Sequence, residues 1–278
     1  MSTTALSPAL SPAADHPAPR TSPASFAALG PLTARSLRAC LRTPSLLVSP
    51  LFMSAFFLVI YEGQLSSVAA TATPGGRYVD VVLPLCLLTT AFTGGATAGQ
   101  LLVTDLGSGY HARLWLTPVA RWTLVTAPVL AGVVVLTGQA TALTALALLL
   151  GLSPVSGPPA LLALVGATVL LGTGFLLLAA ALGLHTGSNA AVSSVTLVFF
   201  PLSFFTATFV PRDQLDGWMA HAADINPLTP PLEAMRGLLT TPWSEQHPLP
   251  GVGVALVILV AGALAAHLAL TRRTRTGV

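Results

Sequence analysis

The stretch ALLALVGATVLLGTGFLLLAAALGL, residues 160 to 184, decides the fold class of this chain. It carries no charged side chain over 25 residues, and a helix needs about 20 apolar residues to cross the roughly 30 Å of hydrocarbon in a membrane. An apolar run of about 10 to 14 residues would instead suit a core helix of a soluble domain. The stretch therefore predicts a transmembrane helix.

The composition of the whole chain agrees with this prediction. Hydrophobic residues make up 53% of the 278 residues and charged residues only 8%, with a mean hydropathy of +0.79. So few charges cannot cover the surface of a soluble globule. The net charge of +3 comes from arginine alone, because the chain has no lysine. A Walker A loop needs a lysine for the nucleotide phosphates, so the sequence excludes such a loop.

We predict an all-α integral membrane domain over residues 25–270 with six transmembrane helices. The predicted spans are residues 45–61, 79–103, 122–151, 160–184, 191–210 and 250–270. The third run is long, but two helices of about 15 residues each would be too short to cross, so one tilted helix is expected.

Arginine placement orients these helices, because cytoplasmic loops are enriched in arginine and lysine. With a cytoplasmic N-terminus, nine arginines lie inside and three, Arg77, Arg212 and Arg236, lie outside. Both termini are then cytoplasmic, with a disordered tail at residues 1–24 and a basic tail at residues 271–278. Arginine without lysine, together with abundant alanine and glycine, hints at a GC-rich genome, so the bacterial cytoplasmic membrane is the expected location.

Residues 30–44, GPLTARSLRACLRTP, predict an amphipathic helix before the first span. The three arginines, Arg35 among them, share one helical face, and Leu37 and Leu41 share the adjoining one. Such a helix would lie on the inner membrane surface. The alternative is a set of ordinary positive-inside arginines beside the span.

The predicted membrane interior holds no Asp, Glu, Lys or Arg in the middle of any span. Proton-coupled transporters carry such residues as relays, so proton-driven transport is disfavoured, while a sodium site built from backbone carbonyls stays open. The chain also lacks an acidic cluster or a spaced set of His and Cys, so neither a catalytic centre nor a metal site is expected. Cys40 and Cys86 are placed at the membrane surface and within it, so no disulfide is expected.

The second predicted span contains GGATAG, in which Gly95 and Gly99 form a small-xxx-small pair. Such pairs let transmembrane helices approach closely, so helix packing is the predicted role of these glycines. The same span carries the polar residues Thr89, Thr90, Thr93, Thr97 and Gln100. These side chains would bond across helices or, as the alternative, form a polar translocation surface.

The internal loop DLGSGYHARLWLTPVAR, residues 105–121, sets three apolar residues beginning at Leu114 in a polar frame. Its glycines can bend the chain away from the membrane, and Pro118 would stop a short helix before Arg121. The residues alone allow either a short protruding helix or a solvated loop.

This loop resembles a segment of ABC-2 type transporter permeases, particularly those similar to daunorubicin-resistance export permeases. In that family an acidic residue, a glycine, an arginine, a proline and a further basic residue recur in this order. Asp105, Gly109, Arg113, Pro118 and Arg121 occupy these positions here. The resemblance implies that the segment, including Leu114, is a coupling helix that docks on a separate ATP-hydrolysing subunit.

The second part of the resemblance is FFPLSFFTATFVPRDQLDGWMAHAADINPLTPPLEAMRGLL, residues 199–239. It looks like the family signature after the fifth span, an apolar run ending in Phe, Val and Pro, then Gly-Trp, then Asn-Pro and a segment closing on Arg. The matching positions are Phe209, Pro211, Gly217, Trp218, Asn226, Pro227, Thr229 and Arg236. Thr206, Asp216, Pro230 and Pro231 depart from the pattern, in which Ser, Pro and bulkier residues are usual.

The residues of this segment also predict an external helical hairpin before the last span. Asn226-Pro227 favours a turn, Thr229 can cap a helix with Pro230 at its first position, and apolar residues from Leu232 onward recur at helical spacing. A second short helix precedes the turn. The hairpin would be either an outer gate that the substrate passes or a cap on the bundle.

The resemblance implies the permease subunit of an ATP-driven exporter for a hydrophobic or amphipathic compound such as a drug, an antibiotic or a lipid-like metabolite. The implied partners are a cytoplasmic ABC ATPase subunit, a second permease copy that would form a homodimer, membrane lipid and the small substrate, and no nucleic acid. The chain itself would hold no cofactor and catalyse no reaction, since ATP and Mg would bind the partner. The alternatives are a secondary transporter driven by an ion gradient and a permease for a polysaccharide or lipid, with a membrane enzyme or scaffold last.

Overall fold

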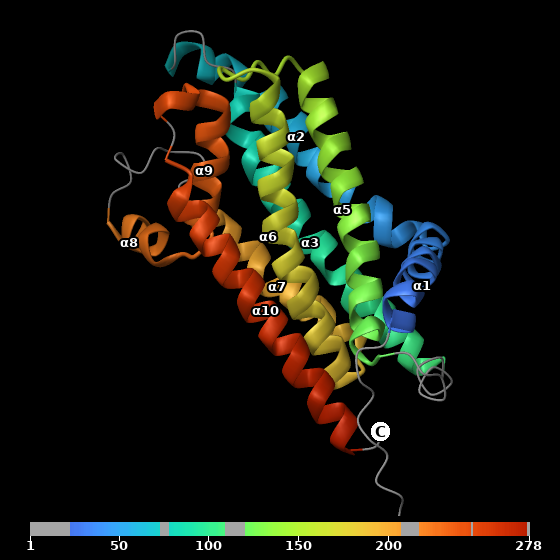
Figure 1. Ribbon diagram of the computed structural model, residues 1–278. Helices are drawn as coiled ribbons and strands as arrows, with labels where there is room; N and C mark the ends of the chain where they lie inside the picture. The colour runs from blue at the N-terminus through green and yellow to red at the C-terminus, as the bar shows by residue number, and fades with distance from the viewer. Residues whose placement is uncertain (1–22, 73–77, 109–119, 207–216, 246, 277–278) are drawn as a thin grey trace, which may run out of the picture.

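The computed structural model describes residues 23–72, 78–108, 120–206, 217–245 and 247–276. Within these ranges the chain forms helices and no strand (Figure 1), which confirms the predicted all-helical fold. The elements are α1 (Pro23–Leu41), α2 (Pro44–Ala72), α3 (Tyr78–Gly107), α5 (Trp122–Leu149), α6 (Pro158–Thr186), α7 (Asn189–Phe204), α8 (Trp218–Ile225), α9 (Thr229–Thr240), the 3₁₀ helix η2 (Trp243–Glu245) and α10 (Leu249–Thr276).

Among the described helices, five are long and apolar enough to cross a membrane. They are α3, α5 and α6 over their full length, together with Pro44–Gln64 of α2 and Leu249–Arg273 of α10. The long third run forms the single helix α5, as predicted. The sixth predicted span, residues 191–210, is only partly described, and α7 covers its first part with 16 residues, a length of about 24 Å. The structure therefore gives five spans and one shorter apolar helix.

The two ends of the bundle differ in charge. We call the end that carries Arg121 at the start of α5 and Arg272 and Arg273 near the end of α10 the basic end; it lies at the bottom of Figure 1. We call the opposite end, with Tyr78 and the connection between α5 and α6, the far end.

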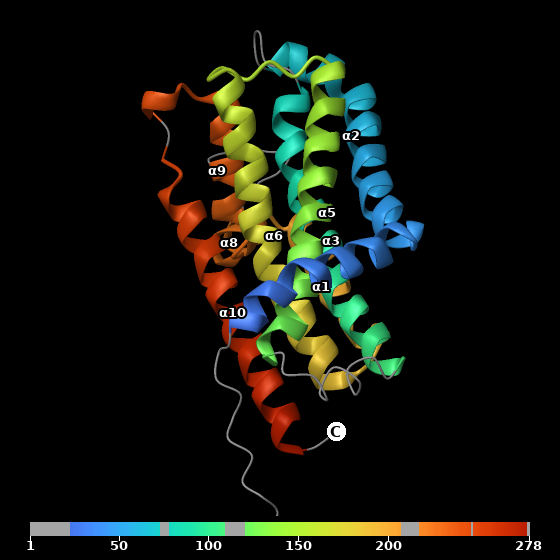
Figure 2. The same ribbon diagram turned by 45° about the vertical axis from the view of Figure 1, so that its right-hand side comes forward.

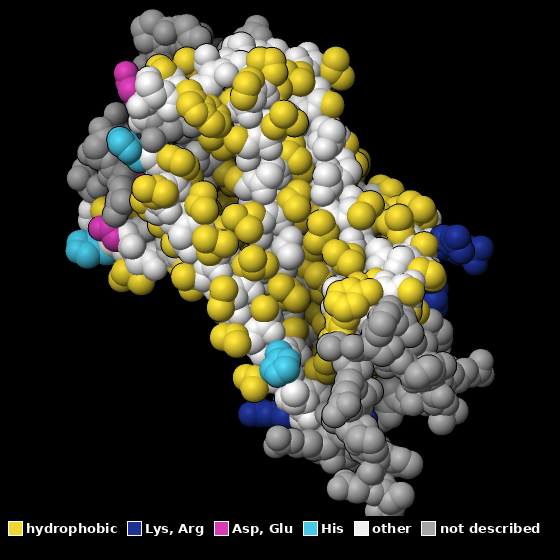
Figure 3. Space-filling view, viewed as in Figure 1, with side chains coloured by type: hydrophobic (Ala, Val, Ile, Leu, Met, Phe, Trp, Pro, Cys, Tyr) yellow, Lys and Arg dark blue, Asp and Glu magenta, His cyan; other side chains and the backbone are white. Residues whose placement is uncertain are grey.

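Helix α3 forms the centre of the bundle. Its most apolar window is 89% buried within the chain, against 11% for α2 and 17% for α10. The outward faces of α2 and α10 instead expose large apolar side chains such as Phe52, Phe56, Val257 and Leu264, and Figure 3 shows a predominantly hydrophobic surface on the side of α10. In a membrane these faces require lipid or another protein against them.

Glycines set the spacing between α3 and α6, the most extensively packed pair of helices. A Cβ at Gly95 would lie 2.6 Å from the Cβ of Phe175, and one at Gly99 would overlap the carbonyl of Ala179. On the facing helix, a Cβ at Gly183 would lie 2.8 Å from the carbonyl oxygen of Gly99. The two backbones are thus in direct contact, and the structure places the predicted small-xxx-small pair against α6.

Side-chain hydroxyls connect α2 to α3 within the bundle. Thr90 Oγ1 donates to Ser54 Oγ at 2.8 Å, and Ser54 Oγ lies 3.2 Å from Thr89 Oγ1. From α5, Gln139 Nε2 donates to the carbonyl of Leu47 at 2.9 Å. These bonds give buried polar groups partners that the hydrocarbon would not provide.

Helix α1 crosses the bundle obliquely against α5 (Figure 2), with further contacts to α2 and α3. Its buried face differs from the predicted one, because Ser36 and Cys40 are buried while Leu41 is 59% exposed. The predicted arginine face is also divided, since Arg35 forms an ion pair with Asp105 of α3 while Arg38 is exposed. Within the described residues, packing on α5 and the ion pair with Asp105 fix the rotation of this helix.

Helices α8 and α9 flank the turn at Asn226-Pro227, as predicted, and lie within the length of the bundle (Figure 1). Leu228 and Leu232 pack with Leu85 and Leu88 of α3, about 10 to 15 Å along that helix from Tyr78. The other end of α9 reaches the far end of the bundle, where the N–H of Val155 donates to the carbonyl of Leu239 at 2.9 Å. Helix α9 therefore runs from the middle of the bundle to its far end.

We predict that Gly99→Ala destabilises the bundle by about 1 to 3 kcal/mol, because the added methyl overlaps the Ala179 carbonyl and forces α3 and α6 apart. Thermal unfolding of the purified protein in detergent measures the effect. Gly138→Ala on α5 is the matched control, since a Cβ there meets nothing within 4 Å. Equal melting temperatures for the two variants would contradict the packing role.

Candidate functional site

The basic end holds a direct connection between α1 and the segment predicted to couple to an ATPase. Arg35 donates through both terminal nitrogens to Asp105, with Nη2 to Oδ1 at 2.7 Å and Nη1 to Oδ2 at 2.9 Å. This bidentate geometry is the strong form of a charge-assisted hydrogen bond. Because Asp105 lies in the last turn of α3, the ion pair fixes the exit of α3 to α1.

Most of the other predicted coupling residues cannot be placed. Gly109, Arg113, Leu114 and Pro118 lie outside the described residues. Arg121 is exposed at the N-cap of α5, where its side chain makes no capping hydrogen bond. The structure therefore positions the two ends of the segment and shows that the first end is tied to α1.

A buried thiol lies one helical turn beyond this ion pair. Cys40 is fully buried and packs with Leu101 of α3 and Val135 of α5. Burial raises the pKa of the Cys40 thiol from 9.0 to about 11. Both Cys40 and Cys86 are free and buried, which confirms that they form no disulfide.

Asn226 organises the turn between α8 and α9. Its Nδ2 donates to the carbonyl of Leu202 on α7 at 2.6 Å, and its Oδ1 accepts the N–H of Leu228 at 2.9 Å. Asn226 is 4% exposed, and its bonds give the Leu228 N–H its acceptor and the Leu202 carbonyl a second donor beside the N–H of Phe205. Through these bonds the Asn226 side chain connects α7, α8 and α9 and fixes the point along the bundle at which α9 begins.

Thr229 does not cap α9 as the sequence predicted. The N-cap is Leu228, and Thr229, the first residue of α9, donates its hydroxyl to the carbonyl of Ala223 at 2.7 Å. A cap at Thr229 is absent because Pro230 and Pro231 have no N–H to donate and the N–H of Leu232 donates to the carbonyl of Leu228 at 3.1 Å. Thr229 instead closes α9 onto α8.

The remaining predicted hairpin residues lie in different surroundings. Trp218 is 70% exposed at the start of α8, with its ring 6.3 Å from that of Phe205, and Pro227 is exposed. Arg236 is half-buried on α9, where Glu233 and Tyr78 interact with its charge. Phe209 and Pro211 lie outside the described residues.

A concave surface lined by many hydroxyl-bearing residues lies between α2, α3 and α7. It encloses about 380 Å³, and seven of its eleven lining residues carry a hydroxyl or an amide. These seven are Ser45, Ser49, Thr93, Thr97, Gln100, Ser193 and Thr196. We call this the hydroxyl surface. The polar residues of the second predicted span fall into two groups. Thr89 and Thr90 form hydrogen bonds within the bundle, whereas Thr93, Thr97 and Gln100 face this hollow.

Sequence reasoning missed four members of the hydroxyl surface, namely Ser45, Ser49, Ser193 and Thr196. The available signal was a serine or threonine recurring at helical spacing on α2 and on α7, in runs that are otherwise apolar. That the two series face the same hollow follows only from the packing of α2 and α7 around α3.

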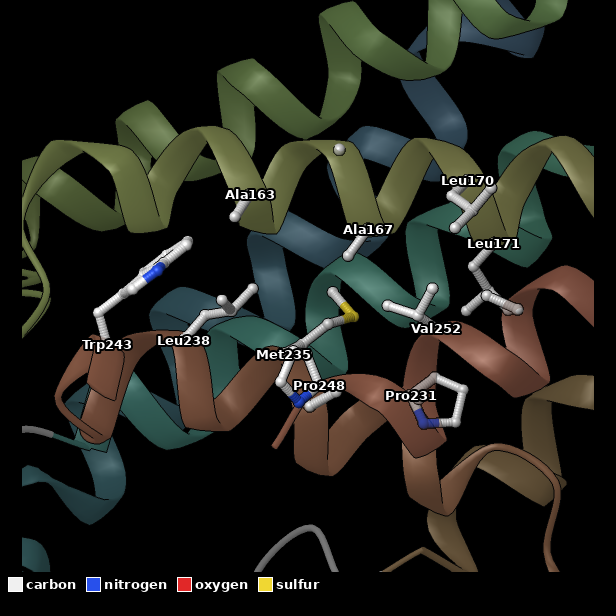
Figure 4. Close-up of a pocket in the computed structure, with 14 residues that line it drawn as sticks. Ala163, Ala167, Leu170, Leu171, Pro231, Met235, Leu238, Trp243, Pro248 and Val252 are labelled. Carbon is white, nitrogen blue, oxygen red and sulfur yellow. The ribbon is translucent and has the colours of Figure 1, made fainter. Parts of the chain in front are cut away.

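An apolar crevice of about 360 Å³ lies between α6, α9 and α10. Figure 4 shows Ala163, Ala167 and Leu170 of α6 facing Met235 and Leu238 of α9 and Val252 of α10 across it, with Trp243 at one end. No charged residue lines the crevice. It can hold an apolar group but offers no anchor for a charged one.

Nothing in the described part of the chain points to chemistry on a bound substrate. There, no three His, Cys, Asp or Glu side chains come together as a metal site. What the structure does provide is a set of membrane-length helices with a hydroxyl-rich hollow between α2, α3 and α7, which is the architecture of a multi-pass membrane protein.

The particular family follows from sequence comparison. The chain matches the ABC-2 type transporter family over residues 28–240 and belongs to that family. It is similar to the protein named "Probable doxorubicin resistance ABC transporter permease protein DrrC" of Mycobacterium tuberculosis, in strains CDC 1551 / Oshkosh and ATCC 25618 / H37Rv. The identity is 25% over 190 residues, which cover 68% of this chain and 68% of each relative. The family resemblance stated from the sequence is confirmed.

We predict that Arg35→Gln increases the alkylation rate of Cys40, because loss of the ion pair loosens α1 and exposes the thiol. In the native protein the pKa of about 11 leaves about a hundredfold less thiolate than the ordinary value of 9.0 at the same pH. Maleimide labelling of a Cys86→Ala background measures the rate. Arg38→Gln, on the same helix but exposed, is the control. The ion pair does not hold α1 in place if both variants label as slowly as the parent.

We predict that Asn226→Ala lowers the stability of the α8–α9 segment, because it removes the acceptor of the Leu228 N–H and the bond that ties the turn to α7. A buried N–H that loses its acceptor costs about 1 to 3 kcal/mol. Limited proteolysis should then cleave near α8 faster than in the parent chain. Asn189→Ala, at an exposed asparagine on α7, should leave the cleavage rate unchanged.

Proposed function

We propose that this chain is the membrane subunit of an exporter that moves a small hydrophobic or amphipathic compound, powered by ATP hydrolysis in a separate subunit. The match to the ABC-2 type transporter family over residues 28–240 carries the proposal. The relatives are named for doxorubicin resistance, and doxorubicin is a compound of the proposed class. The chain has no lysine and hence no Walker A loop, which supports placing ATP and Mg in the partner.

The proposed orientation sets the basic end in the bacterial cytoplasm. Arg121, Arg272 and Arg273 gather at this end, as the enrichment of arginine in cytoplasmic loops requires. The far end, with α9 and Trp243, then faces outward. In this arrangement the start of α1 and the end of α10 both lie on the cytoplasmic side.

Coupling would begin at residues 105–121. A partner ATPase that closes on ATP would push this segment toward the membrane, and the Arg35–Asp105 ion pair would pass the movement to α1 as well as to α3. Since α1 continues into α2 after only Arg42 and Thr43, the displacement reaches a helix that lines the hydroxyl surface. The roles of Gly109, Arg113, Leu114, Pro118 and Arg121 in docking belong to this proposal.

The hydroxyl surface is the proposed route of the substrate. Its hydroxyls and amide can pair with the few polar groups of an amphipathic compound, and the lack of charge around it suits a mostly apolar one. A second copy of the chain would face it and close the route from the opposite side. The outer face of α2 is little buried within the chain, which leaves space for such a copy beside the hydroxyl surface.

The α8–α9 segment is the proposed outer gate. It occupies the far half of the bundle and depends on the turn held by Asn226. A small rotation of α9 could open the route without breaking the membrane-spanning helices, since the crevice beside α6 leaves room on one side. Phe209, Pro211, Trp218, Pro227, Thr229 and Arg236 are the further residues assigned to this gate.

The first experiment is affinity purification of the tagged chain from native membranes, with vanadate-sensitive ATP hydrolysis measured in the eluate. We expect a co-purifying ATPase in the parent and reduced association in Asp105→Asn, because the coupling segment loses its attachment to Arg35. Asp224→Asn, at an exposed acid on α8, is the control. Purification of the chain without ATPase under mild conditions would favour transport driven by an ion gradient.

We further predict that Thr97→Val combined with Thr196→Val slows doxorubicin efflux from cells that express the complex. Each hydrogen bond lost to the substrate is worth about 0.5 to 1.5 kcal/mol, so loss of two should lower efflux roughly five- to hundredfold. Thr141→Val replaces an exposed threonine of α5 away from the hydroxyl surface and should have no effect. Unchanged efflux in the double variant at equal protein level would show that the substrate does not pass the hydroxyl surface.

A further inference from the structure

A second groove lies between α6, α7 and α10, on the side of α7 opposite the hydroxyl surface. It encloses about 530 Å³. Helix α6 contributes its base through Leu178 and Ala181, α7 contributes Val198 and Phe199, and α10 contributes Ala265 and Leu268. All six residues are apolar, so the groove has the surface of a binding site for hydrocarbon.

The groove changes character at the basic end of the bundle. There its lining ends in His185 of α6 and Arg272 of α10, both exposed. Among the described residues that line the groove none is Asp or Glu, and Arg272 gives this end a positive charge. One residue further on, Arg273 donates to the carbonyl of Leu184 and fixes the end of α10 to α6. This bond fixes the position of α10 relative to α6 at the positively charged end of the groove.

We infer that this groove binds an anionic phospholipid, with an acyl chain along α6 and the phosphate at Arg272 and His185. From His185 to Leu178 the groove extends seven residues along α6, about 10 Å, so it lies within one leaflet of the roughly 30 Å hydrocarbon core. Basic pockets between transmembrane helices on the cytoplasmic side suit acidic headgroups. With the proposed orientation, the lipid belongs to the inner leaflet.

Charge and position favour lipid over the other possible occupants. A second copy of the chain is expected at the hydroxyl surface, which Ser193 and Thr196 of α7 line, whereas Val198 and Phe199 of the same helix face the groove. The apolar crevice between α6, α9 and α10 has no charged residue and so cannot select a headgroup. Only this groove combines an apolar length with a cationic end among the three hollows.

The test measures lipid retention and needs neither transport nor ATP, so it can fail without the proposed function failing. The full chain, with any ATPase that co-purifies, is placed in nanodiscs of equal phosphatidylglycerol and phosphatidylcholine, re-extracted in detergent and analysed for bound lipid by mass spectrometry. We expect phosphatidylglycerol to be enriched over phosphatidylcholine. Arg272→Gln should lower that enrichment about fivefold, since one arginine near an anionic headgroup contributes about that factor.

Two further variants make the result specific. Arg42→Gln removes an exposed arginine between α1 and α2 and should leave the enrichment unchanged. Ala265→Phe fills the apolar length and should reduce retention of phosphatidylglycerol even with Arg272 in place. Equal retention of the two lipids, or an equal loss in Arg272→Gln and Arg42→Gln, overturns the proposal. A change of oligomeric mass in Ala265→Phe with bound lipid unaltered would assign the groove to a second copy and overturn it as well.

Discussion

The direct backbone contact between α3 and α6 is the constraint on which the rest of the bundle depends. In a membrane, apolar side chains gain nothing from leaving lipid for one another, so helices associate through close packing and interhelical hydrogen bonds. Gly95 and Gly99 of α3 bring Phe175, Ala179 and Gly183 of α6 into contact that any side chain would prevent. With α6 fixed there, α10 packs on its other side, where a Cβ at Gly262 would lie 2.6 Å from the carbonyl oxygen of Gly174.

The polar side chains in this bundle have two different surroundings. Hydroxyls between α2 and α3, such as Ser54 and Thr90, pair with each other and hold the helices together. One turn further along α3 the hydroxyl of Thr93 still returns to the carbonyl of Thr89, yet the side chain lines the open hollow. A transporter of weakly polar compounds needs this kind of surface, with groups that can exchange partners and without charges that would hold a substrate or an ion too tightly.

The sequence was sufficient for the long helices because their apolar runs are as long as the membrane is thick, and α3, α5, α6 and α10 follow the predicted runs closely. It was insufficient wherever a residue's role depends on a distant partner. The pairing of Arg35 with Asp105 joins positions 70 residues apart, and the depth of α9 depends on a bond from Asn226 to Leu202. Twelve residues of amphipathic helix fit a surface hairpin as well as a helix inside the bundle, so α9 could not be placed from its pattern.

Because α9 begins midway along the bundle, the polar turn at Asn226 lies far inside a structure whose hydroxyl surface reaches inward from the basic end. Along α7, only six residues separate Thr196 from Leu202, whose carbonyl Asn226 binds, a rise of about 9 Å. Near this short interval Phe92, Phe175 and Phe199 form a chain of edge-on ring contacts, with centroids 6.3 and 4.7 Å apart. Only this short interval of α7, rather than the full thickness of the bilayer, therefore separates the hydroxyl surface from the polar turn at Asn226.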